Sequence, residues 1–324
     1  MSWQRIRDSL RDIAADRRRG ARELVIDCAR MLRAQLSEVQ PAVFESATQL
    51  ELRELARWVI STQPEMAPFY HLGAVIMGEG GEGEGEGEGE GGGGGGGGGS
   101  VEKLAVRLGE FISGLEAEPD AAVAAKLIRP GATIASYSRS GSILAALRLA
   151  HAGGTPFSVW VGESRPGYEG RTLATDLSAA GIDVELMTDV VLFDSVGAGA
   201  ADLVWVGADA VGRDLFRNKV GTRALCLLAG LESTPVYVLA DRTKFLPEEL
   251  WCGSEEREGG EVWPEAPPSV RVRNPYFEDV PLSTLEGGGV VVAEGILAPR
   301  EIRARVEDAA AALAMVAEQF RSQR

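Results

Sequence analysis

The chain is poor in the residues that build disulfide frameworks and metal centres. Its 324 residues include only three cysteines, Cys28, Cys226 and Cys252, and two histidines. An odd number of cysteines without C-x-x-C spacing argues against a disulfide framework, and His71 and His151 belong to no metal-ligand pattern. We therefore expect a reduced protein with no resident metal and no cofactor.

Long apolar runs are also missing. The longest apolar stretches are far shorter than a membrane span, and residues 1–5 lack the basic-then-apolar pattern of a signal peptide. The formal net charge of −15 argues against a general nucleic-acid binder, because a phosphate backbone needs a basic face. The sequence thus predicts a cytoplasmic protein that binds neither membranes nor nucleic acid directly.

Lysine is scarce, since 29 of the basic residues are arginine and only four are lysine. High acidity with little lysine suits a salt-rich cytoplasm, although GC-biased codon usage would give the same composition. Two of the four lysines, Lys219 and Lys244, fall where we expect a binding site. Lysine offers a mobile point charge and arginine a rigid fork, so both positions favour phosphate contacts, with coincidence as the alternative.

Five short apolar stretches alternate with helix-length segments rich in alanine and leucine. They cover residues 133–135, 158–161, 184–187, 203–206 and 236–239. This alternation predicts an α/β fold with a parallel, Rossmann-like sheet. Right-handed crossovers place the carboxyl end of every strand at one edge, where open α/β sheets bind ligands. Polar or charged residues follow each stretch, so we expect a site at that edge.

The rest of the chain divides by composition. The expected parts are an N-terminal helical domain over 1–77, joining helices over 101–128, the α/β domain over 129–299 and a C-terminal helix over 300–324. Residues 78–100 are almost entirely Gly and Glu, so they bury no apolar area and should form a disordered tether. Residues 251–268, rich in Gly, Glu and Pro, are expected to be a surface loop.

The turn after the first stretch, Y-S-R-S-G-S at 137–142, is rich in hydroxyls. Hydroxyls and free N–H groups at a helix start bind anions, although ordinary N-capping by Ser140 or Ser142 gives the same sequence. Neither G-x-G-x-x-G nor G-x-x-x-x-G-K-[ST] occurs here, which argues against a nicotinamide dehydrogenase and a P-loop NTPase.

Two further motifs carry polar chemistry. Asp209 directly follows a fully apolar stretch, so partial desolvation should raise its pKa towards the range useful for proton transfer; helix capping is the alternative. Asn218 and Lys219 are followed by Gly221 and Thr222, which places an amide, a cation and a close-approach glycine in a row. This row suits a hydroxylated, phosphorylated ligand.

The ordered set of motifs resembles the translation initiation factor 2B alpha/beta/delta-subunit family, which includes methylthioribose-1-phosphate and ribose-1,5-bisphosphate isomerases. The motifs are R-G-A at 19–21, Q-P-E-M-A-P at 63–68, Y-S-R at 137–139, E-S-R-P at 163–166, G-A-D at 207–209, N-K-V-G-T at 218–222, T-K-F at 243–245 and N-P-Y-F at 274–277. The resemblance implies a helical domain and a Rossmann-like domain with the ligand between them. It also implies dimers or higher homo-oligomers formed through the α/β domain.

The resemblance also implies roles for individual residues. The implied ligand-binding residues are Arg19, Gly20, Ala21, Arg139, Ser140, Arg165, Asn218, Lys219 and Lys244. The family's catalytic carboxylate falls on Asp209, whereas its catalytic cysteine is replaced by Ser138. A serine hydroxyl is far less acidic than a thiol and needs an added base for the same proton exchange. Gln63 stands where ribose-bisphosphate isomerases have arginine, and this loss weakens binding of a second phosphate.

Three functions follow from this resemblance. The Y-S-R turn resembles that of regulatory initiation-factor subunits, so the first hypothesis is a subunit-like protein. It would bind a phosphorylated sugar or nucleotide as a sensor ligand and have a translation factor as a candidate partner. The second is an aldose–ketose isomerase acting on ribose-1,5-bisphosphate or methylthioribose-1-phosphate, in which Asp209 moves a proton and Ser138 replaces the thiol. The third is a structural assembly subunit with a vestigial pocket.

Overall fold

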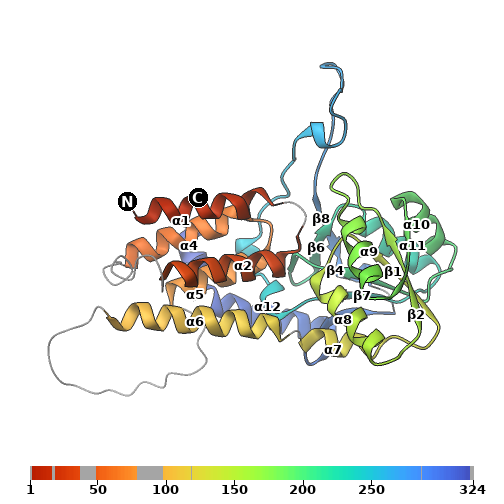
Figure 1. The fold of residues 1–324 in the computed structure, drawn as a ribbon, viewed down its shortest axis with the longest axis horizontal. Helices are drawn as coiled ribbons and strands as arrows, with labels where there is room; N and C mark the ends of the chain where they lie inside the picture. Colours follow the sequence, from red (N-terminus) through yellow and green to blue (C-terminus); the bar gives the residue numbers. More distant parts are fainter. Residues whose placement is uncertain are drawn as a thin grey trace. The chain divides into compact units, whose positions relative to one another are not determined.

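The computed structural model describes residues 2–16, 19–36, 49–78, 98–117, 119–285 and 287–321. The chain divides into two compact units (Figure 1). The helical unit comprises Met1–Asp16, Ala21–Ala117 and Asp308–Arg324, and the α/β unit comprises Arg17–Gly20 and Glu118–Glu307. Most of the Gly/Glu tether expected over 78–100, namely residues 79–97, lies outside the described residues.

Amphipathic helices build the helical unit. They are α1 Ser2–Ala15, α2 Ala21–Ala34, α4 Gln49–Thr62, α5 Ala67–Met77, α6 Gly98–Glu116 and α13 Ala314–Arg321. Apolar residues three or four positions apart give helices such as α2 a buried stripe, which contains Leu24, Cys28 and Leu32, whereas α5 is buried on nearly all sides. Gly78 ends α5 with a left-handed φ of 98°, and residues 98–100 already belong to α6. The expected tether thus begins at the C-cap of α5, and its last three residues belong to α6.

The C-terminal segment differs from the single helix expected over 300–324. It forms α12 Pro299–Ala312 and α13, separated at the fully buried Leu313. Helical hydrogen bonding continues on both sides, because the Leu313 N–H donates to the Ala309 carbonyl and the Ala317 N–H donates to the Leu313 carbonyl, each at 2.9 Å. The apolar stripe thus predicted the helical content, while the break falls at a core residue that the pattern does not distinguish.

A seven-stranded sheet forms the centre of the α/β unit, in the order β10-β9-β7-β4-β1-β2-β3. Its strands are β1 Ala132–Tyr137, β2 Phe157–Gly162, β3 Asp183–Met187, β4 Leu203–Gly207, β7 Val236–Leu239, β9 Gly289–Val292 and β10 Gly295–Leu297. The five predicted stretches are all strands, and they pair in parallel. β9 adds in parallel to β7, and β10 is an antiparallel edge. The predicted α/β class with a mostly parallel sheet is confirmed.

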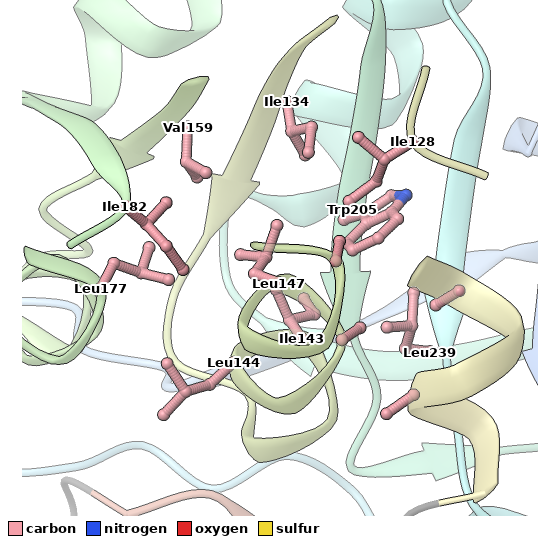
Figure 2. Packing of buried hydrophobic residues seen from close by; sticks show 14 of the residues in the cluster. Ile128, Ile134, Ile143, Leu144, Leu147, Val159, Leu177, Ile182, Trp205 and Leu239 are labelled. Carbon is pink, nitrogen blue, oxygen red and sulfur yellow. The ribbon is translucent and has the colours of Figure 1, made fainter. Parts of the chain in front are cut away.

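Helices α7 Pro119–Ala125, α8 Gly141–Ala152 and α9 Glu169–Ala179 cover this sheet around one hydrophobic core. Figure 2 shows Ile143 and Leu147 of α8 in the same cluster as Ile134 and Trp205 of the strands. Burying an aliphatic side chain of this size contributes about 1.5–3 kcal/mol. This packing fixes where the strands end, and so it fixes the turns that follow them.

A second sheet was not expected. It is three-stranded and antiparallel, with β6 Leu215–Lys219 between β5 Ala210–Val211 and β8 Phe277–Pro281. The sequence of β6, L-F-R-N-K, does not look like a buried strand, because three of its five residues are polar or charged. They are nevertheless buried in the folded structure. Between β7 and β8 the expected surface loop contains a short 3-10 helix, Gly259–Glu261, and a long excursion projects from this unit (Figure 1).

Within the described ranges, no helix is both long enough and apolar enough to cross a membrane.

Candidate functional site

The turns that follow β1, β2, β4 and β7 lie at one edge of the sheet, called here the strand-end edge. Parallel pairing of these strands places their carboxyl ends together. Gly207, the last residue of β4, shows how tightly the turns meet. A Cβ atom added there would lie 2.9 Å from Cβ of Ser140 and 3.9 Å from Oδ1 of Asn218. Only glycine allows this approach, which brings the β1–α8 turn, the end of β4 and β6 together.

Asp209 lies two residues beyond this contact. Its backbone N–H donates to the carbonyl of Arg217 at 2.8 Å, which places Asp209 beside Asn218 where β5 pairs with β6. The residue is only 9% exposed. The carboxylate expected to follow an apolar strand is therefore buried and next to the amide of the second motif.

Lys244 lies on the other side of β5. Phe245, the next residue, forms a parallel bridge to Val211, and the Leu246 N–H donates to the Val211 carbonyl at 2.9 Å. Lys244 is 5% exposed, and within the described ranges its ammonium has no hydrogen-bond or ion-pair partner. A buried cation without a counter-charge is costly, so this position favours an anionic ligand.

Lys219 behaves differently from Lys244. Its Nζ donates to Oε1 of Glu169 at 2.8 Å, and the two side chains are 3% and 8% exposed. The same ammonium lies 4.4 Å from the ring centroid of Tyr276. Lys219 is therefore engaged by a carboxylate and an aromatic face of its own chain.

Asn218 and the start of α11 Thr222–Leu231 form a local network. Nδ2 of Asn218 donates to Oγ1 of Thr222 at 3.0 Å, and that hydroxyl donates to the Lys219 carbonyl. Oε1 of Glu278 accepts from the backbone N–H groups of Gly221 and Arg223 at 2.7 and 2.9 Å. The Glu278 carboxylate thus occupies the N-terminus of α11. It accepts hydrogen bonds from two backbone N–H groups that would otherwise suit an anionic ligand.

The turns after β1 and β2 are linked by side-chain hydroxyls. The Ser138 N–H donates to Oγ of Ser164 at 2.8 Å, and the Asp189 carboxylate accepts from the N–H groups of Ser164 and Arg165. Ser138, Ser164 and Tyr168 all have left-handed φ values, between 60° and 66°. Such conformations cost energy in residues with side chains, and they concentrate at binding and catalytic sites.

Several expected ligand-binding residues have protein partners in these turns. Nε and Nη2 of Arg139 donate to Asp176 at 3.2 and 3.0 Å. Arg165 is exposed and donates to the Val262 carbonyl at 3.2 Å. A Cβ atom at Gly20 would lie 3.5 Å from the Arg139 carbonyl, so Gly20, with Arg19 before it, borders the β1–α8 turn. Ala21 begins α2 and is assigned to the helical unit.

Three carboxylates near the strand-end edge were given no individual role by sequence reasoning: Glu169, Asp189 and Glu278. Glu169 and Asp189 stand in the first turns of α9 and α10 Asp189–Gly197, where acidic residues usually complement the helix dipole. Tyr137 lies among these turns, and the pKa of its phenol responds to the three carboxylates. Burial and then these three carboxylates raise the pKa of Tyr137 well above its ordinary value. Its phenol therefore remains a donor, to the Val220 carbonyl at 3.0 Å.

The cysteines supply no substitute for the missing catalytic thiol. Burial raises the pKa of Cys28 and of Cys226 to about 12. Cys252 is half-buried, with Sγ 3.5 Å from Nη1 of Arg217. Within the described ranges, no group of three or more His, Cys, Asp or Glu side chains could hold a metal ion.

The fold and these turns define an α/β protein with a helical N-terminal region and a polar strand-end edge. A sequence model of the Initiation factor 2 subunit family matches residues 17–299. The chain therefore belongs to the Initiation factor 2 subunit family, and the resemblance drawn from the ordered motifs is confirmed. It is 30% identical over 305 residues to a putative translation initiation factor eIF-2B subunit 2-like protein of Pyrococcus abyssi (strain GE5 / Orsay), covering 92% of this chain and 99% of that protein.

Two further relatives complete the comparison. The methylthioribose-1-phosphate isomerase of Cronobacter sakazakii (strain ATCC BAA-894) is 30% identical over 201 residues, which cover 55% of this chain. The chain spans a little over half the length of that isomerase, namely 58%. The crystal structure of the Pyrococcus horikoshii OT3 translation initiation factor eIF-2B superposes with a TM-score of 0.72 at 26% identity, covering 92% of this chain and 98% of that one.

Proposed function

We propose that the strand-end edge binds a phosphorylated sugar or nucleotide as a regulatory or sensor ligand in a translation initiation factor 2B-subunit-like protein. The observation that carries the proposal is Lys244, a residue only 5% exposed whose ammonium has no hydrogen-bond or ion-pair partner in the described part of the chain. Ser140, the N-cap of α8, adjoins Asp209 and also Asn218 of β6, and these three residues offer a hydroxyl, a carboxylate and an amide to ligand hydroxyl groups. A phosphate group supplies the missing negative charge, and a hydroxylated body engages the neighbouring polar groups.

Sensing is favoured over turnover because of the group at position 138. The family's catalytic cysteine is replaced by Ser138, and a hydroxyl exchanges protons far less readily than a thiol. The two fully buried thiols have raised pKa values and remain protonated near neutral pH. The chain therefore keeps groups for binding, whereas a serine stands at the position of the catalytic cysteine that the family resemblance implies.

An isomerase is the second candidate function. It is supported by the likeness to a methylthioribose-1-phosphate isomerase and by Asp209 at the end of β4. Incubation with methylthioribose-1-phosphate or ribose-1,5-bisphosphate, followed by NMR, would detect the ketose product. Turnover that disappears in Asp209→Asn would establish the isomerase and overturn the sensor. Absence of product from a ligand that binds would support the sensor.

Calorimetry tests the binding proposal. Wild-type protein is titrated with AMP, methylthioribose-1-phosphate and ribose-1,5-bisphosphate. We expect at least one ligand to bind, and Lys244→Met should lose about 1.5–3 kcal/mol of its binding free energy, the value of a charged hydrogen bond. Lys126→Met removes an exposed lysine of the same unit and serves as the matched control. Failure of all three ligands to bind, or equal affinity of the Lys244 variant, would contradict the proposal.

We also propose that the chain forms a homo-oligomer through α10 and α11. Val190 and Val191 of α10 and Leu227 and Leu231 of α11 are at least half exposed, and the two helices pack together. Exposed apolar surface of this kind is typical of an interface. Analytical ultracentrifugation should show a dimer or larger species that Leu231→Glu dissociates. Leu149→Glu on α8 is the control, and a monomeric wild type would remove the proposal.

A further inference from the structure

The buried Lys219–Glu169 ion pair makes one part of the strand-end edge different in charge from the part that contains Lys244. Lys219 lies on β6 and Glu169 on α9, and their side chains meet at 2.8 Å with almost no exposure to solvent. The pair carries no net charge, so Lys219 adds nothing to the attraction of an anion. Lys244 is different, because its ammonium has no partner within the described ranges. The two lysines of the edge are therefore not equivalent.

Further carboxylates surround the part of the edge that contains the ion pair. A Cβ atom at Gly221 would lie 2.8 Å from the Tyr137 hydroxyl, and the Gly221 N–H is held by Glu278. On the other side of the same ring, a Cβ atom at Gly162 would lie 2.9 Å from Tyr137 and 3.1 Å from Oδ1 of Asp189. Glu169, Glu278 and Asp189 thus act on Tyr137 from three different elements, α9, β8 and α10.

Glu169 has a second feature that opposes an anion. Its Oε2 is buried and has no hydrogen-bond partner among the described residues. A carboxylate oxygen in this state accepts a hydrogen bond, so it favours a donor and repels a phosphate oxygen. A phosphate placed near Lys219 would therefore lie close to a neutralised cation and to a buried carboxylate oxygen that has no hydrogen-bond partner among the described residues.

We infer that Glu169 is a specificity-determining residue that excludes a second phosphate and restricts the site to singly phosphorylated ligands. This inference rests on the proposed function, because it assumes that a phosphorylated ligand binds at the strand-end edge. The phosphate lies at Lys244, and the opposite end of the ligand is uncharged and bears hydroxyl groups. Sugar monophosphates and nucleoside monophosphates fit this charge pattern, whereas sugar bisphosphates do not.

The test compares ligands that differ by one phosphate. Calorimetry gives the affinities of ribose-1-phosphate, ribose-5-phosphate and ribose-1,5-bisphosphate for the wild type and for Glu169→Gln. The glutamine keeps the shape and an acceptor for Lys219 but removes the negative charge. We expect the bisphosphate-to-monophosphate affinity ratio to rise about tenfold in the variant. Glu294→Gln removes a carboxylate paired with Arg305 at 2.7 Å elsewhere in the α/β unit and should leave the ratio unchanged.

The possible outcomes separate this inference from the proposed function. A wild type that binds a monophosphate, with an unchanged ratio in Glu169→Gln, overturns the inference and leaves the proposed function standing. Failure of the wild type to bind any of the three ligands, and also AMP, overturns both.

Discussion

Replacing Lys219 with methionine should destabilise the protein far more than removal of a surface charge. The Lys219–Glu169 pair is 2.8 Å long, with side chains 3% and 8% exposed, and Oε2 of Glu169 already lacks a partner among the described residues. Without the ammonium, the Glu169 carboxylate would be buried without its ion-pair partner. Removing one partner of such a pair costs about 3–5 kcal/mol, and the lost contact with the Tyr276 ring adds to it.

A double-mutant cycle isolates the pair itself. Glu169→Met combined with Lys219→Met removes both charges and keeps apolar volume, so it should recover most of the lost stability. We expect a coupling energy of at least about 2 kcal/mol. Urea unfolding of the four proteins, followed by tryptophan fluorescence, provides the free energies of unfolding.

The matched control is the Arg171–Glu163 pair in the same turn region. Its length is 2.7 Å, but the Arg171 side chain is 54% exposed. Arg171→Met should therefore cost less than about 1 kcal/mol. The reasoning would be refuted if Lys219→Met cost no more than Arg171→Met, or if the two changes at the buried pair were additive.

Three further predictions follow from the strand-end turns. Gly207→Ala should cost about 1–3 kcal/mol, because its Cβ would lie 2.9 Å from Ser140, and a lower melting temperature that Ser140→Gly restores would show this contact as the cause. Glu278→Ala frees two N–H groups at the start of α11 and should cost about 1–2 kcal/mol by chemical denaturation, whereas unchanged stability would argue against this cap. At pH 8 the native protein should present one rapidly reacting thiol, which is lost in Cys252→Ser. Burial raises the pKa of the other two thiols to about 12, so fast reaction of all three would contradict their burial.

The sequence predicted the main sheet because its central strands, such as β4, are apolar on both faces. Stretches such as 203–206 must be buried on each side, so their periodicity and the polar residues after them mark both a strand and its end. The second sheet was missed because β6 buries Arg217, Asn218 and Lys219. Polar residues of this kind normally predict a loop, and only their tertiary partners make them part of a strand.

The same limit applies to the candidate site. Ordered motifs identified which turns carry polar groups, because strand ends can be located from the sequence. The Glu169–Lys219 pair joins residues 50 positions apart, and Glu278 reaches the start of α11 from β8. No local pattern specifies such pairings, since they depend on how two sheets pack. The pairing of Lys219 with Glu169, on which the proposed specificity depends, therefore came only from the structure.

A crystal structure of the protein with a phosphorylated ligand that binds in calorimetry tests the central claim most directly. We predict that a phosphate oxygen lies within about 2.7–2.9 Å of Nζ of Lys244, while the Lys219–Glu169 pair stays closed. A phosphate bound away from Lys244, or one held by Lys219 after separation from Glu169, would contradict the account.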